Sequence, residues 1–250
     1  PFHRACQWNT VATVEYLYKL YPESISVANN SGLYPIHYVI WGLEYREGDD
    51  PEAAVEVARF LLDCNPNVAS QKHQNELPLY WFCVEANSEN APKLNAYLEI
   101  LQLLHDAYPQ AIEKNVIASN IGSFCQEVQT FINTQLTYAR QATDHRVMTT
   151  PDENGQLPLH VALRVNVTLG SIKLLVKGNP SATRNFDNRG MIPLHMACQY
   201  HHSPSVVEYL IDLNSLTLKM KDMWQNTVLH HACRGENHVM IAFLLEKYDA

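Results

Sequence analysis

The sequence predicts an all-α tandem-repeat fold, a solenoid of helix-turn-helix units with short β-turn tips. Three observations lead to this prediction. A short Pro-x-His pattern recurs along the chain, cysteines recur three residues after the His position, and proline or another helix breaker closes most units. Self-similarity at a fixed period between about 20 and 50 residues marks stacked repeats. The repeat pattern is therefore better evidence for the architecture than the chain length of 250 residues, which alone would suggest one or two globular domains.

The copies of the pattern set the number of units. Five copies begin at Pro1, Pro35, Pro158, Pro193 and Val228, and a sixth, Pro78-Leu79-Tyr80, has Tyr in place of His. Tyr80 and His160 are 80 positions apart, which leaves room for one degraded copy. We expect this copy near Gly122, with Cys125 at its cysteine position. The chain is therefore expected to hold about seven repeats, one of them degenerate.

Each unit has the same physical order. A polar turn such as Asp187-Asn188-Arg189-Gly190 comes first, with Gly available for a positive φ. Proline suits the first turn of the helix that follows, where its missing N–H costs nothing. A second, more amphipathic helix comes next, for example through Val206, Tyr209 and Leu210. Breakers such as Asn179-Pro180 then close the unit.

These segments resemble the ankyrin-repeat family, whose signature is a D-x-x-G turn followed by T-P-L-H-x-A. The closest matches are residues 187–197 and 152–162, and the resemblance covers nearly the whole chain. The signature Thr survives only as Thr227 and is elsewhere Tyr34, Leu77, Leu157 or Ile192. The usual hydroxyl contact to the motif His is therefore expected to be lost in most repeats. Insertions are expected at Gly42 to Pro51 and at Asn87 to Pro92.

Three regions are expected along the chain. Residues 1–111 hold N-terminal ankyrin repeats, the first one truncated, and residues 151–250 hold C-terminal repeats, the last one truncated. Residues 112–150 form the degenerate repeat, with one long helix and a loop. There an apolar stripe runs through Phe124, Val128, Phe131, Ile132, Leu136 and Ala139. This region is expected to act as a hinge or as a docking feature of its own.

Composition excludes some classes of function. A net charge of −8 argues against a nucleic-acid binder, which normally has a basic face, and favours partners with basic patches. No apolar stretch approaches the roughly 20 residues that span a bilayer. The cysteines form no CxxC pairs, which indicates reduced thiols and an intracellular, cytoplasmic location. Both ends resemble the middle of a repeat, so we expect a fragment of a longer protein.

Metal binding and catalysis are the alternatives to a purely architectural role. His195 with Cys198 and His230 with Cys233, near His201, His202 and His231, could in principle ligate zinc. Equivalent helices of stacked repeats lie about 8–10 Å apart, too far for easy convergence on one ion. A Cys–His pair in almost every repeat indicates architecture, because an active site is normally built once. The acidic cluster of Asp49-Asp50 with Glu47 and Glu52 favours a solvated loop over a cation site. We expect no enzyme activity, no cofactor and no metal.

The resemblance implies a partner-binding face. In such proteins the turn tips and the exposed side of the first helix line a concave surface. Trp224 on a tip and Trp41 on a helix are the best anchor candidates, with packing against the adjacent insertion as the alternative for Trp41. Arg164, Arg189 and Arg234 could accept an acidic peptide or remain a solvated face. Val84 holds a further first-helix position. The residues assigned to this surface are Asn30, Ser31, Leu33, Trp41, Glu76, Gln156, Arg164, Asn188, Arg189, Met191, Gln199, Met223, Trp224 and Arg234.

The function expected from the resemblance is protein–protein interaction, as a scaffold, tether or adaptor in a larger assembly. The partner is expected to be a protein, not nucleic acid, and no membrane insertion is expected. The alternative is a regulatory or substrate-recruiting arm of an enzyme or channel whose functional domain lies outside these residues. The step from fold to function is an analogy, since a fold by itself does not supply a site.

Overall fold

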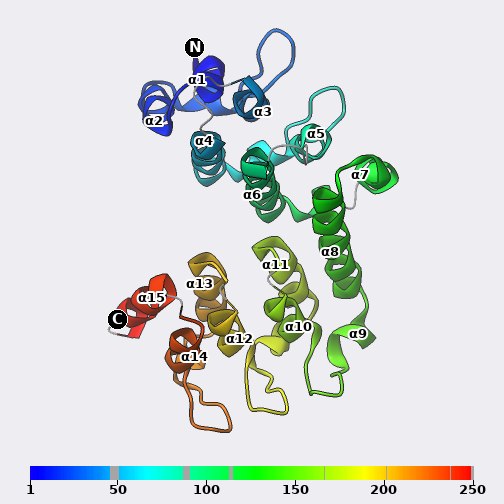
Figure 1. The fold of residues 1–250 in the computed structure, drawn as a ribbon, viewed down its shortest axis with the longest axis vertical. Coiled ribbons are helices and arrows are strands. Elements are labelled where there is room, and N and C mark those ends of the chain that lie inside the picture. The colour runs from blue at the N-terminus through cyan, green and yellow to red at the C-terminus, as the bar shows by residue number, and fades with distance from the viewer. Residues whose placement is uncertain are drawn as a thin grey trace. The chain divides into compact units, whose positions relative to one another are not determined.

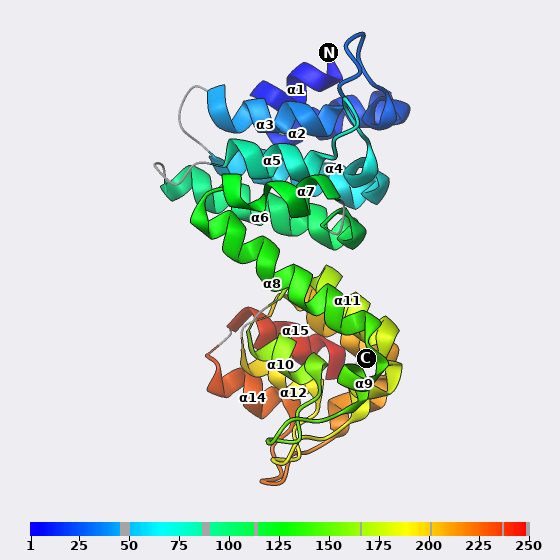
Figure 2. The same ribbon diagram turned by 90° about the vertical axis from the view of Figure 1, so that its right-hand side faces the viewer.

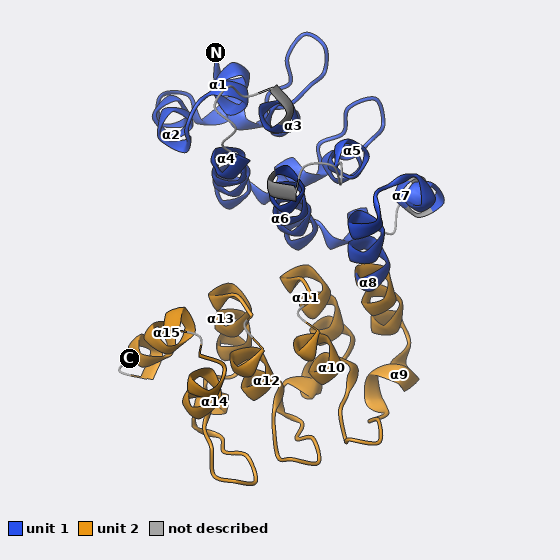
Figure 3. Ribbon diagram, in the orientation of Figure 1, with its two compact units in different colours: residues 1–134 blue, residues 135–250 orange. Residues whose placement is uncertain are grey.

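The computed structural model describes residues 1–45, 51–86, 91–112, 115–165, 167–200, 202–236 and 238–248. The chain divides into two compact units, residues 1–134 (unit 1) and residues 135–250 (unit 2) (Figure 3). The described residues are helical apart from turns, loops and one isolated bridge between His73 and Glu76. The all-α helix-turn-helix fold is therefore confirmed.

Unit 1 contains pairs of helices in which a first helix is followed by a second. First helix packs on first helix, from α1 to α3 to α5, and second helix packs on second, from α2 to α4 to α6 (Figure 1). Two layers result. The bounds are α1 (Phe2–Trp8), α2 (Val11–Leu20), α3 (Pro35–Tyr45), α4 (Pro51–Cys64), α5 (Pro78–Glu85), α6 (Ala91–Ala107) and α7 (Asn115–Asn120), followed by α8 (Gln126–Thr143), which crosses the unit boundary.

Unit 2 repeats this layering. First helices α10, α12 and α14 form one layer, and second helices α11, α13 and α15 form the other (Figures 1 and 2). The bounds are α9 (His145–Thr149), α10 (Pro158–Arg164), α11 (Leu169–Gly178), α12 (Pro193–Gln199), α13 (Pro204–Leu213), α14 (Val228–Arg234) and α15 (His238–Tyr248). The unit's core runs continuously between the layers, with Ile172, Leu194 and Val207 among its buried side chains.

The motif histidine caps the start of four first helices, α3, α10, α12 and α14. Backbone N–H groups of Tyr34, Leu157 and Ile192 donate to Nδ1 of the His three residues later, over 3.2, 3.3 and 3.1 Å. A side chain at the third helical position thus satisfies an N–H that the helix leaves unpaired. Any residue can supply this N–H, which explains why the signature Thr is dispensable. Its hydroxyl contact occurs where Thr survives, between Thr227 Oγ1 and Nδ1 of His230, 2.9 Å apart.

The predicted breakers begin short 3₁₀ helices rather than plain loops. Proline is the first residue of η1 (Pro22–Ser26), η2 (Pro66–Ser70), η3 (Pro109–Ala111) and η5 (Pro180–Arg184). In η6 (Ser215–Lys219) proline is missing, and Asn214 caps the turn by accepting a hydrogen bond from the Leu216 N–H. These turns carry the chain from the second helix to the next tip.

The tips of unit 2 are three separate loops with the same pattern of hydrogen bonds. Asp187 Oδ1 accepts from the N–H groups of Arg189 and Met191, over 2.9 and 2.8 Å. Asp152 and Asp222 form the same pair of bonds in their own tips. Neighbouring tips are joined, because the Met223 N–H donates to the Arg189 carbonyl over 3.1 Å. A short Asp or Asn side chain suits this role because it can reach backbone N–H groups two to four residues on.

The degenerate repeat departs partly from expectation. The long helix exists as α8, and Val128, Ile132, Leu136 and Ala139 of the predicted stripe are buried. The register predicted for Cys125 is wrong. Gly122 lies in η4 (Ile121–Ser123), and Cys125 directly precedes α8, so it is not part of the first helix α7. The loop expected after the long helix also contains α9, because Asp144 caps it by accepting from the Arg146 N–H and Met148 is fully buried.

Parts of the two predicted insertions lie outside the described residues. These parts are residues 46–50, which include Glu47, Asp49 and Asp50, and residues 87–90. His201, one of the histidines weighed as a zinc ligand, also lies outside them.

The tip geometry leads to a stability prediction at Gly190. Its φ is +71°, and an added Cβ would come within 2.8 Å of the Met223 backbone nitrogen in the next tip. The left-handed conformation and the steric conflict together should cost Gly190→Ala about 1–3 kcal/mol of unfolding free energy. Urea unfolding monitored by circular dichroism measures this change.

Gly122→Ala is the control, because an added Cβ there meets no atom within 4 Å. It should leave the unfolding free energy nearly unchanged. Equal stability of the Gly190→Ala variant and the parent protein would contradict the tip geometry.

Candidate partner-binding surface

The residues predicted to bind a partner fall into three groups by exposure. Those at loop tips and first-helix ends are mostly exposed, others are half-buried, and a few are buried. The exposed ones are Asn30, Ser31, Arg164, Asn188, Arg189, Met223, Trp224 and Arg234; the half-buried ones are Trp41, Glu76 and Gln199; the buried ones are Leu33, Gln156 and Met191.

Leu33, Gln156 and Met191 do not belong to a solvent-facing surface, because only 7, 6 and 3% of their surfaces are exposed. Each directly follows the tip glycine, where the chain turns back toward the first helix. Their N–H groups bond to the side chain that organises the tip, as Met191 does with Asp187. Gln156 also donates from Nε2 to Asp187 Oδ2 of the next tip, over 3.2 Å. These side chains join repeats, and we remove them from the candidate surface.

The tip that precedes α14 presents large apolar side chains to solvent. Trp224 is 57% exposed and Met223 is 60% exposed. The backbone beneath them is fixed, because Asp222 accepts the Trp224 N–H and Met223 bonds to the Arg189 carbonyl. Arg189 is exposed on the adjoining tip. The exposed tryptophan is therefore carried on a hydrogen-bonded loop that is joined to the tip of Arg189.

A buried polar network supports this tip from inside. His231 donates from Nε2 to Asp222 Oδ2 over 3.0 Å, and its Nδ1 lies 3.1 Å from Oε1 of Gln199. Burial lowers the pKa of His231, although the bond to Asp222 opposes this shift. Burial raises the pKa of Asp222, but hydrogen bonds from Asn226, His231 and Trp224 outweigh it and lower that pKa to about 2. Half-buried Gln199 is thus engaged with α14 rather than directed wholly outward.

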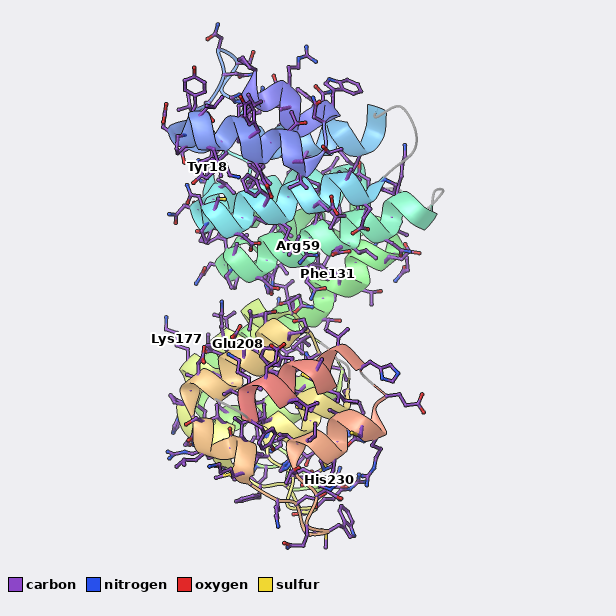
Figure 4. The ribbon with its side chains drawn as sticks, turned by 90° about the vertical axis from the view of Figure 1, so that its left-hand side faces the viewer. Tyr18, Arg59, Phe131, Lys177, Glu208 and His230 are labelled. Carbon is purple, nitrogen blue, oxygen red and sulfur yellow. The ribbon has the colours of Figure 1, made fainter. Side chains whose placement is uncertain are left out.

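The remaining predicted residues are spread over several repeats. Trp41 packs edge-on against Tyr38, with ring centroids 4.9 Å apart. Arg164 and Arg234 end α10 and α14, which both pack against α12 between them. Arg164, Arg189 and Arg234 therefore do not form one compact anion site. Figure 4 labels the exposed His230 on α14, and Lys177 and Glu208 on the opposite, second-helix layer.

The recurring histidines act between repeats. His160 Nε2 lies 3.0 Å from the Asn185 carbonyl, and His195 Nε2 lies 3.2 Å from the Met220 carbonyl, each in the following repeat. Since Nδ1 of each ring accepts a backbone N–H, the proton resides on Nε2, which donates to the carbonyl. Burial, together with the nearby His231, lowers the pKa of His195 to about 4. These histidines are neutral structural bridges at neutral pH.

Among the recurring cysteines, Cys233 is exposed, whereas Cys83 and Cys198 are fully buried free thiols packed in the core. Burial raises the pKa of both, that of Cys198 to about 12, so the thiolate that would act as nucleophile or metal ligand is disfavoured. Within the described ranges, no three His, Cys, Asp or Glu side chains are grouped so that they could hold a metal ion.

The sequence analysis did not predict a hollow that lies in unit 1. Of the residues that line it, only Glu76 and Val84 had been named as surface positions. The hollow has a volume of about 300 Å³, and Glu76, Tyr80, Trp81, Val84 and Glu85 line it. All except Glu76 belong to α5. The signal in the sequence was Tyr80, which stands where other repeats have His, followed directly by Trp81.

None of the helices, as far as the structure describes them, is both long enough and apolar enough to cross a membrane.

The fold and these motif contacts define a stack of helix-turn-helix repeats joined by capping histidines and hydrogen-bonded tips. Residues 98–222 match the family model described as ankyrin repeats in three copies. Because the match spans half of the chain, the chain belongs to the ankyrin-repeat family. Ankyrin repeats generally serve as protein–protein interaction modules and are typically not catalytic.

Similarity to individual proteins is slight. None of the curated proteins matches the chain. Among solved structures, a similar chain occurs in the complex of the predatory endopeptidase Bd0816 from Bdellovibrio bacteriovorus with the immunity protein Bd3460. The two chains share 16% sequence identity with a TM-score of 0.36, over 98% of this chain and 97% of that one. This likeness bears on neither partner nor activity.

The buried histidines predict that the protein loses stability on mild acidification. Burial lowers the pKa of His37, His105 and His195 to about 4, whereas an unfolded histidine titrates near its ordinary value of 6.5. Between these values the unfolded chain binds more protons, so stability falls as pH falls. Each histidine contributes a slope of about 1.4 kcal/mol per pH unit in this window.

Urea unfolding at a series of pH values from neutral to about 4 measures the slope. His195→Gln should reduce it. A free energy of unfolding that stays constant across this window would contradict the buried, neutral state of these rings.

Proposed function

We propose that this chain is a scaffold, tether or adaptor that binds a partner protein across its tips and exposed first-helix residues. In unit 2 the proposed surface comprises Arg164, Asn188, Arg189, Met223, Trp224 and Arg234. In unit 1 it comprises Asn30, Ser31, Trp41 and Glu76. Half-buried Gln199 is a supporting residue that positions the tip through His231.

The exposed Trp224 is the observation that carries the proposal. An exposed tryptophan keeps a large apolar area in water, and Trp and Arg are the residue types most enriched among interface hot spots. Removing a well-packed hot-spot tryptophan costs about 2 kcal/mol or more of binding free energy. Met223 extends the apolar area, and Arg189 on the adjoining tip adds a donor for carboxylate or carbonyl groups of a partner.

The rigidity of the tips supports binding rather than an incidental exposure. Binding is weakened by the entropy lost when loops become ordered, and a loop already fixed in its bound shape avoids much of that cost. Here Asp222 holds the loop through two backbone N–H groups, and His231 holds Asp222 from the interior. Partner contacts would therefore be made by a preformed edge of the molecule.

The test compares the partners captured by the parent protein with those of a Trp224→Ala, Arg189→Ala, Arg234→Ala variant. Affinity capture followed by quantitative mass spectrometry measures each partner's enrichment. If Trp224 is the anchor, the specific partners should decline by about thirtyfold or more, which corresponds to about 2 kcal/mol.

The matched control is Lys177→Ala, Arg184→Ala, Leu216→Ala, which also removes two cations and one exposed apolar side chain. Lys177 lies on the second-helix layer (Figure 4), and this variant should retain the partners. If the tip variant retains its partners, or if both variants lose them equally, binding at the tips is refuted.

A further inference from the structure

The hollow on α5 combines negative charge with aromatic faces. Glu76 comes from the tip before the helix, Tyr80 and Trp81 from its first turns, and Val84 and Glu85 from its last turn. At about 300 Å³ it is at the small end of ligand-binding pockets, a size that suits one side chain rather than a cofactor.

Neither glutamate is neutralised by the described part of the protein. The Glu76 and Glu85 side chains form no hydrogen bond or ion pair there; the backbone of Glu76 alone is engaged, in its bridge to His73. Two carboxylates beside one hollow favour a cation between them. An apolar occupant is disfavoured, because it would strip water from the carboxylates without replacing the lost hydrogen bonds.

Contacts with neighbouring rings hold Tyr80 and Trp81 in place. The Trp81 ring packs edge-on against His73 and His37, with centroids 5.1 and 5.4 Å apart. Tyr80 packs edge-on against Phe124, with centroids 6.1 Å apart. Both rings remain partly exposed, as Tyr80 occupies the position of the motif histidine without being buried as His160 and His195 are. A binding site built on fixed rings loses little entropy on binding.

This combination selects a guanidinium. A cation over the face of Trp or Tyr gains about 0.5–2 kcal/mol. Arginine also stacks flat on aromatic rings, is less strongly hydrated than lysine and can form paired hydrogen bonds to carboxylates. Two cation–aromatic contacts occur inside unit 2, Lys173 with Tyr209 and Lys247 with Phe243. Each joins one lysine to one ring, so neither combines two rings with two unpaired carboxylates.

We propose that the α5 hollow is a specificity pocket for one arginine side chain of the partner protein, with its guanidinium against Tyr80 and Trp81 and between Glu76 and Glu85. The proposal rests on the proposed function in that it takes the partner to be a protein. It adds that the partner presents an arginine in an accessible segment, which suits a chain of net charge −8.

The test uses a defined probe and the whole chain. The probe is the capped peptide Gly-Ser-Arg-Ser-Gly, and its comparison has citrulline, an uncharged isostere, in place of arginine. Two-dimensional NMR follows the indole N–H of Trp81, which is assigned from its disappearance in Trp81→Phe. The arginine peptide should shift this signal in a saturable manner, and the citrulline peptide should bind about tenfold or more weakly.

Variants separate the pocket from general acidity. Glu76→Gln with Glu85→Gln should weaken the arginine peptide at least tenfold, and Glu85→Gln alone, at an exposed position, about threefold. The control Glu52→Gln with Glu56→Gln removes the same charge from exposed positions on α4 and should keep the affinity within about twofold. Far-ultraviolet circular dichroism checks that each variant is folded.

Each opposite result overturns the pocket. These results are no saturable shift up to the solubility limit of the peptide, equal binding of the citrulline peptide, or equal losses in the pocket and control variants. They leave the proposed function standing, because partner capture through Trp224 is measured separately and does not involve α5.

Discussion

The hydrogen bond from a buried motif histidine to a carbonyl of the next repeat is the interaction on which the stack depends. The rings of His160 and His195 each serve two repeats, because Nδ1 caps the ring's own helix and Nε2 donates to the chain that follows. A net bond of this kind contributes only about 0.5–1.5 kcal/mol, but leaving its buried groups unpaired costs about 1–3 kcal/mol. The histidine therefore fixes how neighbouring repeats align, while apolar burial supplies most of the stability.

The α5 hollow occurs where this pattern changes. At His37 the ring is buried, but Nε2 has no hydrogen-bond partner among the described residues. The tip that follows is a tight hairpin, with Gln74 and Asn75 both at positive φ. Trp81 packs against His37 there, and Tyr80 stands in place of the next histidine. Departures from local rules tend to mark function, and here they coincide with the α5 hollow.

The regular repeats were largely predictable from the sequence. Proline fixes the first turn of α3, α5, α10 and α12, and the Asp187 and Asp152 tips follow from their D-x-x-G segments. The degenerate repeat was predictable only as a long apolar stripe, because nothing in its sequence places the first helix. Its register failed at Cys125, where a single cysteine carried the alignment.

The surface was harder to predict than the fold. Leu33, Gln156 and Met191 lie on tips where some side chains point to solvent and others point inward. Sequence spacing does not reveal that the residue after the glycine points inward. The partial burial of Gln199 depends on His231 and Asp222, a contact between different repeats. The α5 hollow likewise needs the tip residue Glu76 and both ends of α5 to be placed together.

The tautomeric state of the motif histidines tests the central interaction most directly. Long-range proton–nitrogen NMR correlation at neutral pH distinguishes the two neutral tautomers from the charged ring. His160 and His195 should carry their proton on Nε2, with Nδ1 unprotonated, because Nδ1 accepts a backbone N–H and Nε2 faces a carbonyl. A proton on Nδ1, or a charged imidazolium, would contradict the bridge between repeats.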